Sequence, residues 1–248
     1  PPPPPPPPIF FFHAQHGIRY CLLSRGLGDV YKRQLQRDGS QWQVVLGNQA
    51  IRADGVVLGV PASTAATIVS TVSPNLSAEL KMIECAGAAV VSLGFDQQDI
   101  SHSLRAAGMI IPKVAGKRIL AASFSSSKFP GRAPSNAVLI RTFIGGALDM
   151  GIASLPDEEV VKEVLVDLRT TIGLHGNPSI VQVDRWHRSM PQYNIGHVER
   201  IKKIRQAEAQ LQSFGLAGSA YEGVGIPQVI QSGQIAAASA IKDQAISE

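Results

Sequence analysis

The segment from residue 214 to residue 233 constrains the fold most, because it joins a short apolar strand, a glycine-rich turn and the start of a helix. Gly218, Gly223 and Gly225 allow the backbone to approach a ligand without an intervening Cβ. Pro227 suits a first helical turn, whose free N–H groups favour an anion or an electron-rich ring edge. The spacing fits the edge of a cofactor site and a tight packing turn equally well.

Hydrophobic periodicity predicts the other elements of the chain. A long series of strands through the middle of the sequence indicates a mostly antiparallel sheet, with a Ser, Gly and Pro loop at 125–134. Ser73 and Ser154 are the expected helix caps. Strands are expected at 41–46, 51–60, 87–95, 108–111, 118–124, 137–144, 180–186 and 214–217, and helices at 62–69, 73–84, 154–173, 197–212 and 227–241.

Residues 1–34 are expected to be a non-native or disordered leader that contributes nothing to the fold. Eight prolines open it, and its end at 28–34 resembles translated adapter sequence. A half-matched dinucleotide fingerprint at 26–31 lacks its third glycine and a preceding strand. The leader holds four basic residues and one acidic residue out of a formal net charge of +4. The remaining sequence is therefore nearly neutral, and we expect no nucleic-acid partner.

The sequence nominates no catalytic residue and no metal ligand. Cys21 and Cys85 are too far apart in sequence to form a redox or metal-binding motif, and His187 and His197 have no other ligand at suitable spacing. The serines of 123–127 are not flanked by the glycines of a nucleophile elbow. Hydrolase and metalloenzyme mechanisms are therefore not supported.

Four stretches together resemble the protoporphyrinogen oxidase family, within the wider flavin amine oxidase group. The resemblance covers residues 41–241. The first and last stretches recur across flavin oxidases, whereas the middle two resemble this family more than its relatives. The stretches are ADGVVLGVPA at 53–62, SSSKFPGRAP at 125–134, MPQYNIGH at 190–197 and GVGIP at 223–227.

The resemblance implies an α/β (α+β) fold, with a partial FAD-binding Rossmann-like domain and an inserted, mostly antiparallel-sheet substrate-binding domain. The expected flavin domain comprises 35–75 and 185–248, and the expected substrate domain comprises 76–184. A full member begins with a Gly-x-Gly-x-x-Gly turn that binds the ADP part of FAD. This sequence lacks that turn, so the isolated chain is expected to bind FAD weakly and to show no turnover.

The resemblance also assigns residues to the cofactor and to the substrate. Trp186 and the backbone of Val224, Gly225 and Ile226 are expected to lie against the flavin, although a buried tryptophan is the commoner alternative. Pocket-lining positions of the substrate chamber are Gly108, Ile110 and Phe143, with strand core as the alternative for the last two.

The implied reaction moves hydride from a porphyrinogen carbon to the flavin, which molecular oxygen reoxidises to release hydrogen peroxide. Three rounds convert protoporphyrinogen IX to protoporphyrin IX in heme biosynthesis. Oxidation of coproporphyrinogen III and a flavin-free porphyrin-binding role are the alternatives, and a homodimer is left open. A carotenoid desaturase is disfavoured by the stretch at 125–134.

The sequence holds no apolar run of the roughly 18 residues that a membrane span requires. The expected helix at 197–212 carries a basic face, which we interpret as a solvated surface, with contact to an anionic membrane as the alternative. A cytoplasmic location is expected, with peripheral membrane association left open. The basic face consists of Arg200, Lys202, Lys203 and Arg205.

Overall fold

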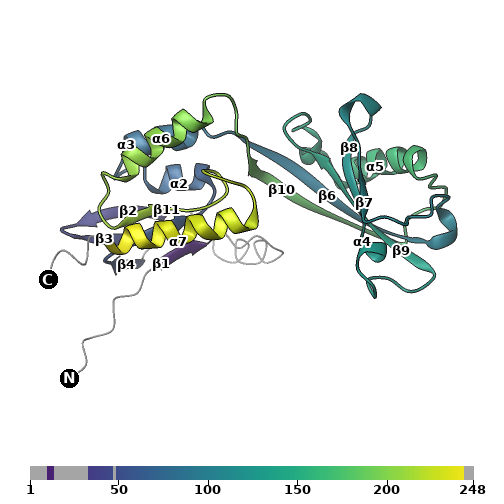
Figure 1. Cartoon of the computed structure of the whole chain (residues 1–248), viewed down its shortest axis with the longest axis horizontal. Coiled ribbons are helices and arrows are strands. Elements are labelled where there is room, and N and C mark those ends of the chain that lie inside the picture. Colours follow the sequence, from purple (N-terminus) through teal and green to yellow (C-terminus); the bar gives the residue numbers. More distant parts are fainter. Residues whose placement is uncertain (1–9, 14–32, 47–48, 243–248) are drawn as a thin grey trace, which may run out of the picture. The chain divides into compact units, whose positions relative to one another are not determined.

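The computed structural model describes residues 10–13, 33–46 and 49–242 (Figure 1). The chain divides into two compact units, unit 1 at 1–84 and 193–248, and unit 2 at 85–192. Each unit has an apolar core of its own.

Unit 1 contains a three-stranded parallel sheet in the order β1-β5-β11. Its strands are β1 (Phe10–His13), β5 (Val56–Gly59) and β11 (Phe214–Leu216). Helix α7 (Ile226–Lys242) packs on this sheet, and Val57 of β5 clusters with small residues that include Ala236 and Ala240. The glycine turn predicted from sequence therefore connects β11, which pairs with the central strand β5, to a helix lying on the same sheet (Figure 1).

A second sheet and three further helices lie in the described part of unit 1. The antiparallel strands are β2 (Arg33–Asp38), β3 (Gln41–Leu46) and β4 (Gln49–Ala53), and the helices are α2 (Ala62–Ile68), α3 (Pro74–Lys81) and α6 (His197–Glu208). The Ser73 side chain accepts a hydrogen bond from the Leu76 N–H, which confirms the expected cap of α3. Trp42 is fully buried in the common core and donates from its indole N–H to the Gln212 carbonyl at 3.1 Å.

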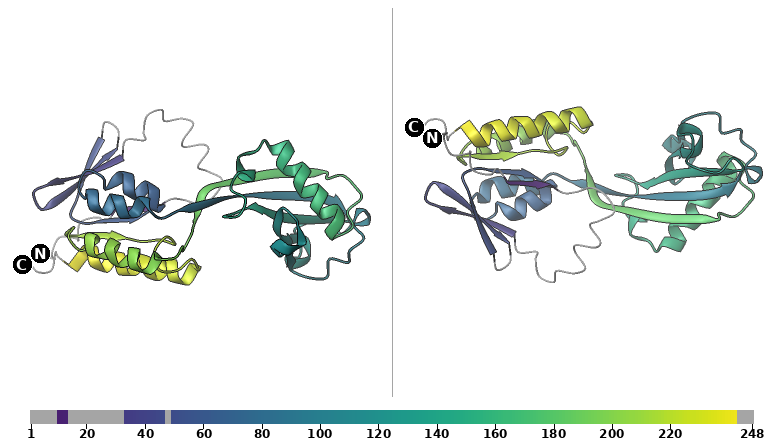
Figure 2. Two further views of the ribbon diagram at one scale, coloured as in Figure 1. Left: turned by 90° about the horizontal axis from the view of Figure 1, so that it is seen from above. Right: turned by 90° about the horizontal axis from the view of Figure 1, so that it is seen from below.

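Unit 2 is a five-stranded antiparallel sheet in the order β10-β6-β9-β8-β7, packed on helix α5 (Figure 2). Apolar residues of α5 repeat every three or four positions and pack on one face of the sheet, because that spacing forms a single helical stripe. The elements are β6 (Cys85–Asp96), β7 (Gly108–Ile110), β8 (Ile119–Phe124), α4 (Ser125–Lys128), β9 (Ala137–Gly145), α5 (Asp157–Thr171) and β10 (Ile180–Pro191).

The predicted α/β class with a separate antiparallel sheet is confirmed, but the unit boundaries differ from the expected domain boundaries. Residues 76–84 belong to unit 1, because α3 packs on α2 and α6. Residues 185–192 belong to unit 2, because β10 continues past a bulge between Trp186 and Met190 along β6. The functional labels of the two domains stay predictions.

The described residues of the expected leader form strands and are therefore ordered, whereas its non-native origin stays a prediction. Phe10–His13 form β1, parallel to β5, and Arg33 and Gln34 begin β2. An extended segment at this edge supplies partners for backbone groups of β5 that β11 leaves unpaired. The fingerprint at 26–31 and most of the predicted leader lie outside the described residues.

Two local predictions are also corrected. Ser154 lies in a 3₁₀ turn, and α5 begins at Asp157 with Pro156 at the N-cap. The proline disfavours a helical conformation at Leu155, which is extended, so the helix cannot start at Ser154. Within the expected loop at 125–134, residues 125–128 form the short helix α4.

Candidate functional site

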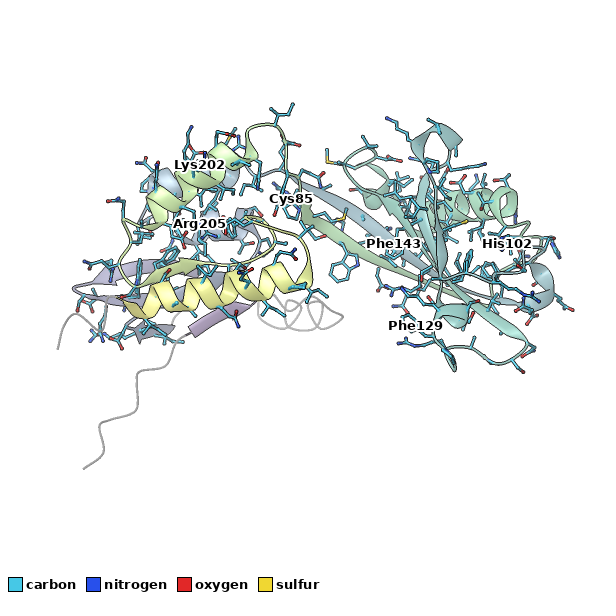
Figure 3. All side chains as sticks on the ribbon, viewed as in Figure 1. Cys85, His102, Phe129, Phe143, Lys202 and Arg205 are labelled. Atoms are coloured by element: carbon cyan, nitrogen blue, oxygen red, sulfur yellow. The ribbon has the colours of Figure 1, made fainter. Side chains whose placement is uncertain are left out.

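The register of the unit 2 sheet places the three predicted substrate residues on one face. Residues directly opposite each other in an antiparallel ladder point to the same side of the sheet. Ile110 pairs with Ala121, which pairs with Phe143, while Gly108 pairs with Ser123 one row further along. Their common face is opposite the face that packs on α5, and we call it the outer face; Figure 3 labels Phe143.

Trp186 belongs to the same outer face. It pairs with Ala88 of β6, and Ala88 pairs in turn with Gly145, two residues after Phe143 on β9. The register therefore brings four residues nominated by the resemblance onto one face, from strands β7, β9 and β10 that are separated in sequence. Trp186 is half-buried, as is Phe143.

The environment of Ile110 distinguishes a pocket-lining role from strand core, and that of Gly108 shows an additional structural role. Ile110 is 87% exposed in the structure, so its alternative role as strand core is wrong. A Cβ on Gly108 would collide with the backbone oxygen of Ala122, so this glycine permits the close pairing of β7 with β8. Ile110 is thus an apolar side chain available to a ligand, whereas Gly108 has a structural role as well.

In unit 1 the glycine turn exposes the residues nominated for the flavin. The side chains of Val224 and Ile226 are 66% and 77% exposed, on either side of Gly225. Gly223 has φ +146°, and a Cβ there would lie 2.7 Å from the Cβ of Gln228, so glycine also makes room for that side chain. Two exposed apolar side chains around a bare peptide at the start of α7 fit the edge of a flat ring.

The sequence analysis did not single out Tyr193, which holds this turn. Its hydroxyl donates to the Ser219 carbonyl and accepts from the Gly223 N–H, both at 2.8 Å. Its ring stacks on His197 with centroids 3.9 Å apart, and His197 contacts the Tyr221 carbonyl through Nε2 at 3.0 Å. The only sequence signal for this role was membership of the stretch at 190–197.

Replacing Tyr193 by phenylalanine is expected to lower the free energy of unfolding by about 1–2 kcal/mol, because the Gly223 N–H and Ser219 carbonyl lose a common partner. The matched control is Tyr221→Phe. The Tyr221 hydroxyl is buried without a hydrogen-bond partner among the described residues, so its removal should cost nothing. Urea unfolding of both variants measures the difference, and equal losses would contradict this role of Tyr193.

An ion cluster around Arg205, which Figure 3 labels, joins helix α6 to β11 and the glycine turn. Arg205 pairs with Glu208 at 2.6 Å and with Glu222 at 3.1 Å, and Glu208 also accepts from the Leu216 N–H at 2.7 Å. Burial disfavours the charge of Arg205, but its bonds to Glu222 and Glu208 outweigh this and raise its pKa. Burial raises the pKa of Glu208, against the attraction of Arg205, and burial also raises the pKa of Tyr221.

Ion pairs with nearby carboxylates reduce the free positive charge on the basic face of α6. Arg200 and Lys203 approach Glu79 at 4.0 and 3.8 Å, and Arg205 has the partners given above, so three of the four predicted surface cations face carboxylates.

Burial raises the pKa of the Cys85 thiol, although the positive charge of Arg188 acts in the opposite direction. The raised pKa keeps the thiol protonated at neutral pH.

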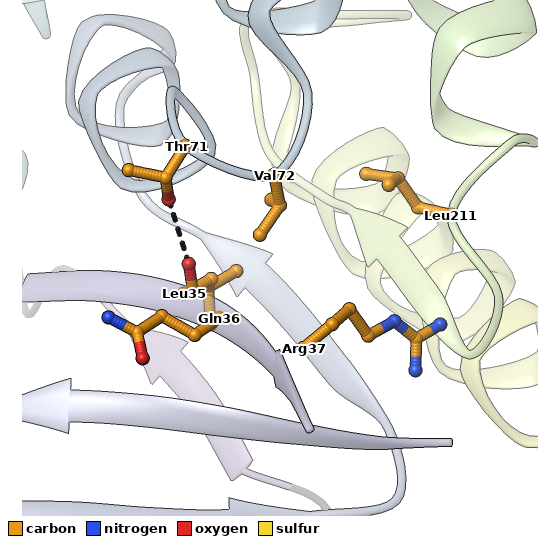
Figure 4. A pocket seen from close by; sticks show the side chains of 6 residues that line it. All are labelled: Leu35, Gln36, Arg37, Thr71, Val72 and Leu211. Carbon is orange, nitrogen blue, oxygen red and sulfur yellow. Dashed lines mark hydrogen bonds between the residues drawn. The ribbon is translucent and has the colours of Figure 1, made fainter. Parts of the chain in front are cut away.

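A hollow in unit 1 contains none of the nominated residues (Figure 4). At its edge the Thr71 hydroxyl donates to the Leu35 carbonyl at 2.9 Å. Its lining consists of Leu35, Gln36, Arg37, Thr71, Val72 and Leu211.

A parallel-sheet unit with a glycine turn before its last helix, and an antiparallel sheet that presents aromatic and aliphatic side chains, fit the flavin oxidoreductase class that the resemblance implies. The family model described as flavin containing amine oxidoreductase matches residues 32–241. The chain belongs to this family, which confirms the expected family and FAD as its cofactor.

Curated relatives of this chain include porphyrinogen oxidases. Coproporphyrinogen III oxidase of Bacillus subtilis (strain 168) is 34% identical over 221 residues, which cover 87% of this chain and 47% of that protein. Protoporphyrinogen oxidase of Homo sapiens is 28% identical, with 89% of this chain and 48% of that protein covered. The chain therefore spans about half the length of these relatives.

A solved structure shares the fold. A protein from Exiguobacterium sp. 255-15, provisionally described as a protoporphyrinogen oxidase, superposes with a TM-score of 0.71 at 26% identity. The match covers 86% of this chain and 45% of that chain. Within the described ranges, none of the helices combines the length and the apolar character needed to cross a membrane.

Proposed function

We propose that this chain is the substrate-binding and flavin-contacting part of an FAD-dependent porphyrinogen oxidase that aromatises its substrate by removing six electrons. The observation that carries the proposal is the outer face of unit 2, on which the register gathers Ile110, Phe143 and Trp186. The apolar part of this sheet face suits the body of a tetrapyrrole, because binding removes apolar surface of both partners from water.

The residues of this chain would bind and orient, since the hard chemistry belongs to the cofactor. When bound, FAD supplies the hydride acceptor. Val224, Gly225 and Ile226 would contact it from unit 1, through exposed apolar side chains and peptide groups at the start of α7. Trp186 stays a predicted flavin contact, located on the outer face of unit 2. Gly108, Ile110 and Phe143 would hold the substrate.

Two porphyrinogens compete as the substrate. Protoporphyrinogen IX is the substrate that the sequence stretches predict. Three relatives named coproporphyrinogen III oxidase are 32–34% identical to this chain, against 28–30% for five relatives named protoporphyrinogen oxidase, and this favours the substrate with four carboxylates. Oxygen as the electron acceptor, release of hydrogen peroxide and assembly as a homodimer are parts of the same proposal.

Turnover of the two porphyrinogens tests the proposal. The protein for this test joins residues 33–242 to the part of the Bacillus subtilis relative that the match leaves uncovered. We expect FAD-dependent formation of porphyrin fluorescence, with a higher kcat/KM for coproporphyrinogen III, and one hydrogen peroxide for each two-electron step. Absence of turnover for both substrates in a folded, flavin-loaded protein would refute the oxidase.

The competing proposal is a porphyrin-binding protein that uses the outer face without flavin. It requires tight binding of porphyrin by the 248-residue chain alone, whereas the oxidase requires the missing part for tight binding. Peripheral membrane association is tested by sedimentation with anionic vesicles, and the ion pairs of α6 favour no binding.

A further inference from the structure

Arg141 is a cation at the centre of the outer face that the sequence analysis did not single out. In the register it pairs with Ser92 of β6 on one side and with Ser123 of β8 on the other. It precedes Phe143 by two positions on β9, so both side chains lie on the outer face. The guanidinium carbon lies 6.0 Å from the centre of the Phe143 ring.

The outer face contains two neighbouring rows that differ in character. One row starts at Asp184 on β10 and is apolar from there on, through Val90, Phe143, Ala121 and Ile110. The adjacent row, through Gln182, Ser92, Arg141, Ser123 and Gly108, is polar and carries the cation. Adjacent rows of one face are about 6.6 Å apart, because same-face residues are two positions apart on a strand. An apolar surface bordered by one cation suits a ligand with an apolar body and an anionic side chain.

Arg141 is available for an anion. Among the described residues it faces no carboxylate, and its contact with the Phe143 ring leaves its hydrogen-bond donors unused. Its side chain is exposed. The one acidic residue in the neighbouring row, Asp184, lies on β10, with β6 between it and β9, and accepts from the Gln182 amide at 3.1 and 3.2 Å.

We propose that Arg141 binds a carboxylate of the porphyrinogen side chains and so fixes the orientation of the macrocycle on the outer face. The inference rests on the proposed function, and it names a specificity-determining contact for it. A guanidinium offers two parallel N–H donors to one carboxylate, which gives orientation as well as affinity. The aromatic ring of Phe143 beside it limits the positions that the guanidinium adopts.

A titration of the 248-residue chain tests the contact, with coproporphyrin III and its tetramethyl ester as probes in the same detergent buffer. We expect weak binding of the acid, and a loss of about tenfold in affinity for Arg141→Gln. The ester, which has no carboxylate, should bind Arg141→Gln and the native chain equally. Arg141→Lys keeps the charge but loses the paired donors, so it should recover only part of the lost affinity.

The matched control is Arg169→Gln, which removes an exposed arginine from α5, the helix on the opposite face of the sheet. It should leave both affinities unchanged. Equal affinities of the native chain and Arg141→Gln for the acid would overturn the inference and leave the oxidase standing. Failure of the native chain to bind the acid would also overturn it, whereas the oxidase itself fails only in the turnover test.

Discussion

Replacing Glu208 by alanine is expected to lower the free energy of unfolding by about 3 kcal/mol, because it breaks a buried ion pair from one side. Glu208 is 8% exposed and accepts from both Arg205 and the Leu216 N–H. Its removal leaves a buried backbone donor of β11 without a partner and removes one of two carboxylates from Arg205. Urea unfolding followed by circular dichroism measures the loss.

Glu222 provides the matched control for this substitution. It pairs with the same arginine, but its side chain is 49% exposed. Water replaces a lost surface partner, so Glu222→Ala should cost less than about 1 kcal/mol. If the two alanine variants were equally stable, the buried pair between α6 and β11 would not be the source of the stability assigned to it.

The second large effect is expected for Gly215→Val in the middle of β11. A Cβ at this position would lie 2.5 Å from the backbone oxygen of Ala236 and 2.9 Å from its carbonyl carbon. These atoms belong to the backbone of α7, which has no rotamer to change, so the helix must move away from the sheet. Overpacking typically costs about 1–3 kcal/mol, and we expect the upper end of this range here because the clash is with backbone atoms. We also expect the α7 end of unit 1 to become sensitive to protease.

Gly151→Ala is the control for Gly215→Val. A Cβ at Gly151 meets no heavy atom within 4 Å, and its φ of −68° is open to any residue. This variant should retain native stability. A folded Gly215→Val protein with native stability and native protease resistance would contradict the close packing of α7 on β11.

Local signals predicted most of the elements. Alternating apolar residues located β8 and β9 to within one residue, and Ser73 before Pro74 located the start of α3. Element ends were less predictable. The pairing of β10 with β6 extends this strand to Pro191, and that pairing depends on residues about 100 positions away.

The candidate site was predicted by resemblance, not by periodicity. The resemblance nominated Trp186, Ile110 and Phe143, but only the register shows that they share one face. Tyr193 could not be found from sequence because its partners lie 26 and 30 residues away. Arg141 was missed because an arginine in a strand has no meaning until its neighbours across the sheet are known.

In the joined protein described above, we expect FAD to rest against Val224, Gly225 and Ile226. The most direct measurement is the visible absorption spectrum of the joined protein described above, after purification with excess FAD and removal of free cofactor. The account predicts a yellow protein with stoichiometric bound flavin, and a much smaller flavin content for Gly225→Val. A folded but colourless joined protein would contradict the account.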